Sequence, residues 1–167
     1  MKNEKIIISG PPGGGKTSII NKLKDLGYLC FSEVTPPKLD LNKSKNKLKL
    51  SEYLFEQRIH QYYSNNIKLS FYDRSIIDVV AYMDYWKMEY PNKWNKQINN
   101  LQYSNKVFYT PSWKNIYIQS EVRQETFSEA AKIDLFLRKA YHSFKYQIIE
   151  LPKKNIDHRV KFIINNL

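Results

Sequence analysis

Residues 10–17 read Gly-Pro-Pro-Gly-Gly-Gly-Lys-Thr, and this run constrains the fold more than any other part of the chain. It follows the β-branched segment Lys5–Ser9 and precedes Thr17–Leu26, where apolar residues recur at helical spacing. Glycines let the backbone turn so that successive N–H groups point inward at phosphate oxygens, and the following helix adds its positive end. The run therefore predicts a strand, a phosphate-binding loop and a helix, in that order.

This loop has direct chemical consequences. Lys16 is expected to reach the outer phosphates, and the Thr17 hydroxyl is expected to bind a magnesium ion that bridges the two terminal phosphates. The sequence thus predicts binding of a nucleoside triphosphate with Mg²⁺, the donor being ATP, or GTP as the alternative. The expected nucleotide-binding residues are Gly10, Pro11, Pro12, Gly13, Gly14, Gly15, Lys16, Thr17 and Ser18.

Short apolar strands alternate with amphipathic helices along the whole chain. This pattern predicts a single α/β domain over residues 1–167, with a five-stranded parallel sheet between two helical layers and ligands at the carboxyl ends of the strands. Two segments are expected to be mobile, a lysine-rich insert at 38–49 and a flap at 112–125. The expected strands are Lys5–Ser9, Tyr28–Phe31, Lys68–Asp73, Lys106–Thr110 and Tyr146–Leu151.

Charged residues follow the second and third expected strands. Asp73 ends the third strand and is expected to hold magnesium together with Thr17, while Arg74 beside it would orient the acceptor or a phosphate. Glu33 follows the second strand and could accept a proton from an attacking hydroxyl. The alternatives are a helix-capping role for Asp73, since Asp and Ser commonly start helices, and a solvated strand-end Glu33.

Composition excludes some functions but does not choose a ligand. The net charge of +11 attracts anionic partners in general. Cys30 is the only cysteine, so no intramolecular disulfide can form. No apolar run approaches the roughly 20 residues needed to cross a bilayer, and no signal-peptide pattern is seen, so we expect no membrane span and a cytoplasmic location. The insert at 38–49 lacks aromatic residues, which disfavours nucleic acid, and anionic lipid is likewise a disfavoured partner.

Further motifs extend the pattern beyond the glycine loop. Glu33 and Asp73-Arg74-Ser75 resemble the acids and the triplet of P-loop kinases that act on nucleosides and nucleotides. Together with Pro111-Ser112-Trp113, Tyr146–Pro152 and Arg159–Ile163, they make the chain similar to a family of small AAA-like predicted ATPases or kinases. That family also looks similar to nicotinamide riboside kinases. The shared run extends from Ile6 to Ile164.

This resemblance implies a three-layer P-loop kinase-like domain and roles for more residues. Arg123 would be a flap arginine that closes on the transferring phosphate, and Trp113 would border the nucleotide or the flap hinge. In nucleoside kinases the helix after the long loop presents Gln and Arg side chains to the acceptor, a role open here to Gln57, Arg58 and Gln61. The alternatives are a surface ion pair for Arg123 and an ordinary exposed helix face for the other three.

Two functions remain after this reasoning. The first is a phosphotransferase that moves the terminal phosphate of ATP to a small nucleoside- or nucleotide-like acceptor. The second is a nucleotide-gated binding module acting on a protein, phospholipid or nucleic acid. A regulatory GTPase is disfavoured, because no Asn-Lys pair in the chain is followed by Asp two residues after the Lys.

Overall fold

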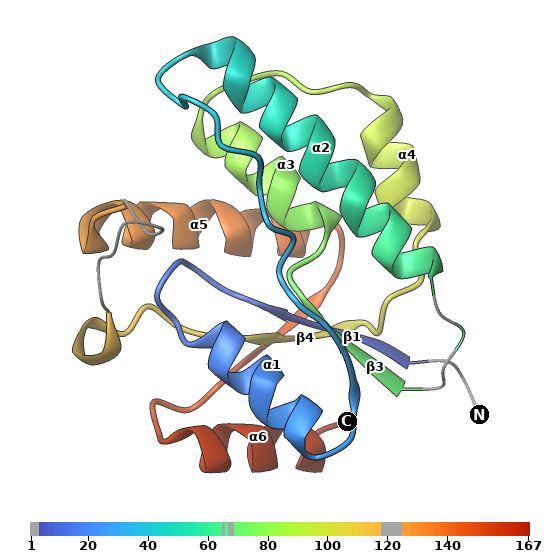
Figure 1. Ribbon diagram of the computed structural model, residues 1–167, viewed down its shortest axis with the longest axis vertical. Helices are drawn as coiled ribbons and strands as arrows, with labels where there is room; N and C mark the ends of the chain where they lie inside the picture. The colour runs from blue at the N-terminus through green and yellow to red at the C-terminus, as the bar shows by residue number, and fades with distance from the viewer. Residues whose placement is uncertain (1–3, 65, 67–68, 118–124) are drawn as a thin grey trace.

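The computed structural model describes residues 4–64, 66, 69–117 and 125–167 (Figure 1). Within these ranges no helix is both long enough and apolar enough to cross a bilayer. The strands are β1 (Glu4–Ser9), β2 (Leu29–Phe31), β3 (Leu69–Asp73), β4 (Lys106–Tyr109) and β5 (Gln147–Glu150). The helices are α1 (Lys16–Asp25), α2 (Ser44–Tyr63), α3 (Ile76–Tyr85), α4 (Lys93–Asn100), α5 (Phe127–Ser143) and α6 (Ile156–Asn165), with a short 3-10 turn, η1 (Lys114–Ile116).

The strands in the described part of the chain form one parallel sheet with the order β2-β3-β1-β4-β5. Ile7 of β1 lies opposite Tyr72 of β3 on one side and Val107 of β4 on the other, so β1 is central. Because the strands run in the same direction, their carboxyl ends meet at one edge of the sheet. The predicted five-stranded parallel sheet is confirmed, and the loops that follow β1, β2 and β3 leave from the same edge.

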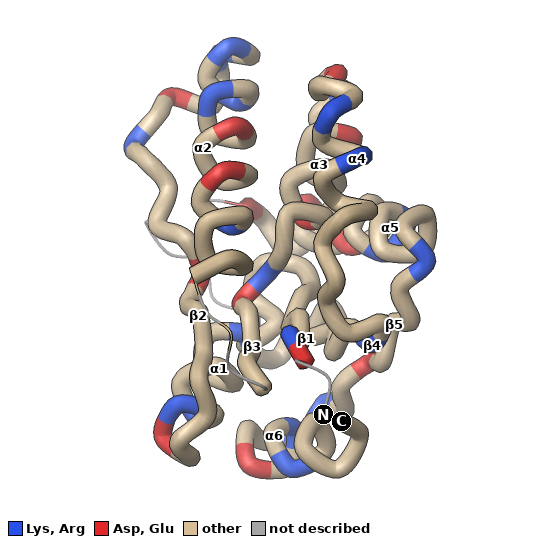
Figure 2. Tube along the Cα trace, turned by 90° about the vertical axis from the view of Figure 1, so that its right-hand side faces the viewer, with Lys and Arg blue, Asp and Glu red and all other residues tan. Residues whose placement is uncertain are grey.

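Helices cover both faces of this sheet, with α1 and α6 on one side and α2, α3 and α5 on the other (Figure 1). Successive side chains of a strand point to opposite faces. Accordingly, Ile6 and Ile8 pack in the core beneath α1 and α6, whereas Ile7 packs in the core beneath α3 and α5. Turned by 90°, the molecule shows α2 above β2 and α5 above β4 and β5 (Figure 2). The three-layer α/β prediction is therefore confirmed.

The sequence pattern predicts a polar loop at 38–49 and then a helix over 51–66, but α2 begins at Ser44. Residues 44–49 are therefore helical, and their prediction as part of a loop was wrong. In this part of α2 the Lys47 ammonium lies 5.4 Å from the centre of the Trp86 ring. Lysine stems can cover apolar surface while the charge stays in water. Packing of this kind stabilises the first turns of α2 without producing an apolar periodicity in the sequence.

The segment predicted as a flap is described at its two ends. It begins with η1, and the Tyr117 hydroxyl then donates a hydrogen bond to the carbonyl oxygen of Glu125. The Tyr117 ring also meets the edge of the Phe127 ring, with the ring centres 5.5 Å apart. The two ends of the segment therefore lie against each other. Residues 118–124, and with them Arg123, lie outside the described residues.

Candidate functional site

The glycine loop connects β1 to α1 as predicted, and it packs directly on the end of β4. Gly10 has a φ of 138°, and an added Cβ there would lie 2.2 Å from Thr110 Oγ1. Helix α1 begins at Lys16 after Gly15, which has a φ of 83° and caps the helix. Residues 10–14 are buried, while Thr17 and Ser18 are exposed on the first turn of α1. The turn between strand and helix thus has the geometry that a phosphate-binding loop requires.

Lys16 folds back over the glycine loop. Its Nζ donates hydrogen bonds to the carbonyl oxygens of Gly10, at 2.9 Å, and Pro11, at 2.8 Å, and its side chain is 5% exposed. Burial and the nearby Arg74 charge lower the pKa of Lys16 to about 7, although Asp73 acts in the opposite direction. A phosphate placed in the loop would add negative charge and favour the protonated ammonium. Lys16 is therefore positioned to respond to an anion in the loop.

Asp73 and Thr17 lie side by side at the carboxyl end of β3. Asp73 is 2% exposed, and its Oδ2 lies 3.5 Å from Thr17 Oγ1, a long contact. Its Oδ1 is buried and has no hydrogen-bond partner among the described residues. Burial raises the pKa of Asp73 to about 6, although Lys16 lowers it in part. A carboxylate with an unsatisfied buried oxygen beside a hydroxyl fits a hard divalent cation such as Mg²⁺. The two residues predicted to hold the metal are thus brought together.

Arg74 links the glycine loop to Glu33. Its Nε donates to Glu33 Oε1 at 2.7 Å, and its Nη1 donates to the Gly10 carbonyl at 3.2 Å. The Arg74 backbone has a φ of 76°, a left-handed conformation, and its N–H donates to the Ile8 carbonyl at 2.9 Å. Glu33 is 44% exposed. Although partial burial raises the pKa of Glu33, the charges of Arg74 and Lys16 lower it overall. Glu33 is therefore ionised at neutral pH and can accept a proton.

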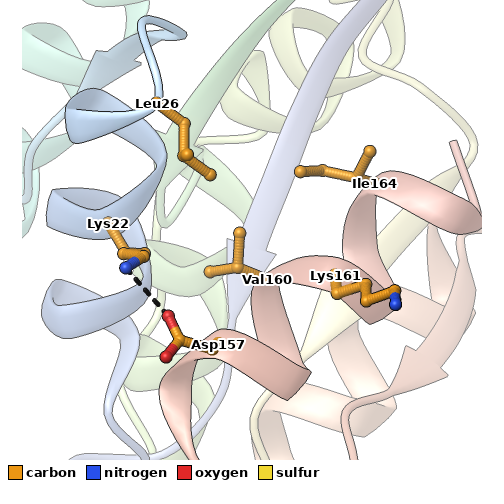
Figure 3. A pocket seen from close by; sticks show the side chains of 6 residues that line it. All are labelled: Lys22, Leu26, Asp157, Val160, Lys161 and Ile164. Carbon is orange, nitrogen blue, oxygen red and sulfur yellow. Dashed lines mark ion pairs between the residues drawn. The ribbon is translucent and has the colours of Figure 1, made fainter.

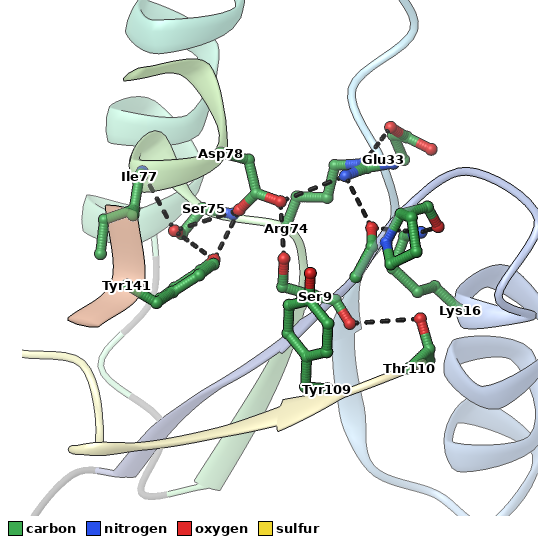
Figure 4. A network of polar contacts seen from close by, with 12 residues as sticks. Ser9, Lys16, Glu33, Arg74, Ser75, Ile77, Asp78, Tyr109, Thr110 and Tyr141 are labelled. Carbon is green, nitrogen blue, oxygen red and sulfur yellow. Dashed lines mark hydrogen bonds and ion pairs between the residues drawn. The ribbon is translucent and has the colours of Figure 1, made fainter. Parts of the chain in front are cut away.

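Behind Arg74 lies a buried polar network that the sequence reasoning missed (Figure 4). Asp78 is fully buried and accepts hydrogen bonds from Ser9, Arg74, Ser75 and Tyr141. One signal for it was present in the sequence. The Ser75-x-x-Asp78 spacing predicts a capping box at the start of α3, and the structure contains that box. The links to Ser9 and Tyr141 could not be predicted, because they join residues far apart in the chain.

The three residues expected to contact an acceptor do not share one face of α2. Arg58 is buried, and its Nη1 donates to the Ser75 carbonyl at 2.9 Å. Gln57 is exposed, whereas Gln61 donates from Nε2 to the Ser32 carbonyl at 3.0 Å. Arg58 therefore supports the start of α3 from within, and Gln61 supports the segment before Glu33. Acceptor contact by these residues stays a prediction.

On the opposite side of the loop, Arg159 of α6 holds the glycine-loop backbone. Its side chain is 1% exposed, and its Nη2 donates to the Gly14 carbonyl at 3.0 Å. The guanidinium carbon lies 5.9 Å from the centre of the Trp113 ring. The nitrogens Nε and Nη1 have no hydrogen-bond partner in the described part of the chain. No role was predicted for Arg159 from the sequence beyond its place in the motif Arg159–Ile163. Its spacing from Ile156 and Ile163 places it on the apolar side of α6, and this spacing could have predicted that Arg159 is buried.

A separate hollow lies between α1 and α6, away from the loop residues (Figure 3). It has a volume of about 340 Å³. Lys22 and Asp157 form an ion pair at its rim, with 2.8 Å between Nζ and Oδ1. Apart from this pair and Lys161 its lining is apolar, and it contains none of the charged groups that surround the glycine loop. The glycine loop and the charged groups around it lie at the carboxyl edge of the sheet, apart from this hollow.

Solved structures with the same arrangement define the class of this fold. Deoxyadenosine kinase from M. mycoides with bound dATP is 17% identical, with a TM-score of 0.67, over 97% of this chain and 98% of that one. The YorR protein of Bacillus subtilis, in complex with phosphorylated GDP, is 18% identical, with a TM-score of 0.64 over 97% and 94%. Thymidylate kinase from Ehrlichia chaffeensis is 13% identical, with a TM-score of 0.63 over 98% of both chains. The fold is that of the nucleotide kinases.

A family model gives the more particular assignment. The model described as an AAA domain, AAA_28, matches residues 5–159, and the chain therefore belongs to this family. The resemblance to small AAA-like P-loop proteins with a kinase-like fold is confirmed. A search of curated proteins found no match.

Proposed function

We propose that this protein is a phosphotransferase that moves the terminal phosphate of ATP, or of GTP, to a small nucleoside- or nucleotide-like acceptor. One observation carries the proposal. Four charged residues from three separate parts of the sequence gather around the glycine loop at the carboxyl edge of the sheet: Lys16, Glu33 and the adjacent pair Asp73 and Arg74. A phosphate-binding loop beside an ionised carboxylate and a guanidinium has the parts that phosphoryl transfer needs.

Each group has a defined task in this proposal. The loop N–H groups and the Lys16 ammonium hold the outer phosphates. Thr17 and Asp73 would hold Mg²⁺, which would offset negative charge on the phosphates. Glu33 accepts the proton of the attacking hydroxyl, and Arg74 donates hydrogen bonds to the oxygens of the transferred phosphate. Arg123 would close over the same phosphate from the flap. Catalysis is then mainly positional and electrostatic.

The comparisons support the acceptor class without selecting a member of it. The similar solved structures include a deoxyadenosine kinase with bound dATP and a thymidylate kinase. These proteins share the fold with this chain at low identity. We therefore propose an acceptor with a nucleoside-like body and a reacting oxygen that reaches Glu33.

Release of nucleoside diphosphate from ATP and GTP tests the proposal. The assay uses Mg²⁺ and compares no acceptor with pooled nucleosides, nucleoside monophosphates and nicotinamide riboside. We expect acceptor-dependent release, which Lys16→Ala abolishes. Lys22→Ala is the matched control, because Lys22 lies on the same helix and pairs with Asp157 at the surface. If no pool raises release above the acceptor-free rate, the phosphotransferase proposal fails.

A nucleotide-gated binding module is the second candidate, and the flap provides the observation that favours it. The Tyr117 ring lies against Gly13, where an added Cβ would meet Cδ2 at 2.4 Å. A nucleotide that moves the loop would therefore also move the flap, which could expose or hide a surface for a protein, phospholipid or nucleic acid. Tight nucleotide binding without acceptor-dependent release, together with nucleotide-dependent cleavage of the flap by protease, would favour this candidate. Unchanged cleavage would remove it.

A further inference from the structure

Asp78 is a fully buried carboxylate directly behind Arg74, and the proposed chemistry gives it no task (Figure 4). Its Oδ1 accepts hydrogen bonds from Ser9 Oγ at 2.7 Å and from Arg74 Nη1 at 3.1 Å. Its Oδ2 accepts from the Tyr141 hydroxyl at 2.5 Å and from the Ser75 backbone N–H at 2.9 Å. The carboxylate thus joins β1, the end of β3, the start of α3 and the last turn of α5.

Capping of α3 explains only one of these four contacts. A capping box needs one carboxylate oxygen at the backbone N–H of the cap residue, and Oδ2 fills that position at Ser75. Oδ1 points away from the helix, toward Arg74 and Ser9. A buried charge is costly unless it is paired and hydrogen-bonded. Although burial raises the pKa of Asp78, the Arg74 and Arg58 charges lower it overall, so the carboxylate is ionised.

Arg74 therefore has two charged partners in very different surroundings. Glu33, bonded to Nε, is 44% exposed, whereas Asp78, bonded to Nη1, is fully buried. In phosphoryl transfer the new O–P bond to the acceptor forms while the P–O bond to the donor breaks and releases the nucleoside diphosphate. Glu33 gains the proton that the acceptor hydroxyl loses in this step. Neutral Glu33 attracts the guanidinium much less than ionised Glu33 does. Among the described residues, Asp78 is then the remaining carboxylate bonded to Arg74.

We propose that Asp78, oriented by Tyr141 and Ser9, is the positioning residue that holds the Arg74 guanidinium beside Gly10 while Glu33 takes up the proton. The inference rests on the proposed function, because contact between Arg74 and the transferred phosphate belongs to it. Asp78 itself touches neither donor nor acceptor. It acts through Arg74 and should change the rate of transfer much more than the affinity for the donor nucleotide.

A double-mutant cycle tests this dependence on Arg74. We expect Asp78→Asn, which keeps the shape and removes the charge, to lower kcat by about 100-fold and to leave KM for the donor unchanged. In an Arg74→Lys background the same change should cause no further loss, because residues that act through each other are not additive. Losses that multiply independently of the residue at position 74 would overturn the proposal.

Two tyrosine variants distinguish a specific effect on Asp78 from a general loss of folding. Tyr141→Phe removes one hydrogen bond to Asp78 and should lower kcat in the same Arg74-dependent way. Tyr109→Phe is the control, since the Tyr109 hydroxyl donates to Asp134 at 2.6 Å, and Asp134 pairs with Arg138 one helical turn away. Tyr109→Phe also removes a hydrogen bond from a tyrosine hydroxyl to a carboxylate, but that carboxylate does not contact Arg74. We therefore expect no change in kcat. An equal effect of both tyrosine variants would count against a specific role for Asp78.

A spectroscopic measurement decides the inference even if no acceptor is found. The ¹⁵Nε–H signal of Arg74, assigned by its loss in Arg74→Lys, should stay ordered in Glu33→Gln, which imitates the neutral acid. It should broaden when Asp78→Asn or Tyr141→Phe is added to Glu33→Gln. A signal that stays ordered in the combined variants would overturn the positioning role. Absence of turnover in every acceptor pool would instead refute the phosphotransferase proposal alone.

Discussion

Replacing Gly10 by alanine tests how closely the glycine loop is built against β4. An added Cβ would lie 2.2 Å from Thr110 Oγ1 and 2.3 Å from the Thr110 carbonyl oxygen. The Thr110 hydroxyl can rotate away from the added Cβ. The Thr110 carbonyl cannot, because the Thr110 backbone is held by the hydrogen bond from its N–H to the Ser9 carbonyl at 2.8 Å. The loop, and not β4, therefore has to move.

Backbone strain and overpacking together determine how much Gly10→Ala lowers the free energy of unfolding. A φ of 138° is rarely adopted by alanine, and such strain costs about 1–3 kcal/mol. Overpacking against a fixed neighbour adds about 1–3 kcal/mol. The Gly10 carbonyl also accepts hydrogen bonds from Lys16 and Arg74, so a shift of the loop displaces both cations. We expect Gly10→Ala to lower the free energy of unfolding by about 4 kcal/mol and to abolish measurable triphosphate binding.

Gly27 provides a control with strain but no collision. Its φ is 87°, and an added Cβ would meet nothing within 4 Å. Gly27→Ala should cost about 1–2 kcal/mol and leave triphosphate affinity unchanged. Urea unfolding and titration with a fluorescent triphosphate analogue measure the two quantities in each variant. Equal losses of stability together with equal affinities would refute the argument that contact with Thr110 shapes the loop.

Three further predictions concern the metal site, the hydrogen bond from Arg159 to the glycine loop, and the dependence of stability on pH. Asp73→Asn should weaken magnesium-dependent nucleotide binding about 10- to 100-fold without changing binding in EDTA, as measured by calorimetry; equal weakening in both would argue against a metal role. Arg159→Met removes the bond to the Gly14 carbonyl, so affinity for inorganic tripolyphosphate should fall. Stability should change by less than about 1.5 kcal/mol, because two unpartnered buried nitrogens are also removed, and unchanged affinity would exclude a bracing role. The pKa of Asp78 is lowered in the folded state, so its contribution to stability is present above the ordinary carboxyl pKa of about 4 and is lost as the pH falls through the lowered value. Urea unfolding should show this acid loss, and Asp78→Asn should reduce it; an identical pH profile in the variant would contradict the assignment.

Much of the fold could be predicted because its signals are local. The apolar run of β1 is continuous, since Ile6 and Ile8 face one core and Ile7 faces the other. The glycine loop could be predicted because glycine tolerates the positive φ that Gly10, Gly13 and Gly15 adopt. Asp73 and Glu33 could be placed at one edge because parallel strands bring their carboxyl ends together.

Other features depend on contacts between distant parts of the chain and could not be predicted from local patterns. The first turns of α2 contain a lysine run without apolar periodicity, and their packing includes Lys47 over Trp86. Arg58 was expected to contact an acceptor, or else to lie on an exposed helix face, but it is buried and donates a hydrogen bond to the Ser75 carbonyl. Tyr141 carries no local signal for its bond to Asp78. Each of these features depends on a tertiary contact, which the residue pattern of one helix cannot predict.

The central position of β1 has a consequence for the order in which the protein folds. β1 is synthesised first, but its hydrogen-bonding neighbours β3 and β4 come much later in the chain. Thr110 packs against Gly10 and Gly14, and its N–H donates to the Ser9 carbonyl, so the packing of the glycine loop is complete only after β4 has been made. Non-local pairing of this kind slows folding. A nascent chain that ends before β4 should therefore leave β1 exposed and in need of protection from aggregation.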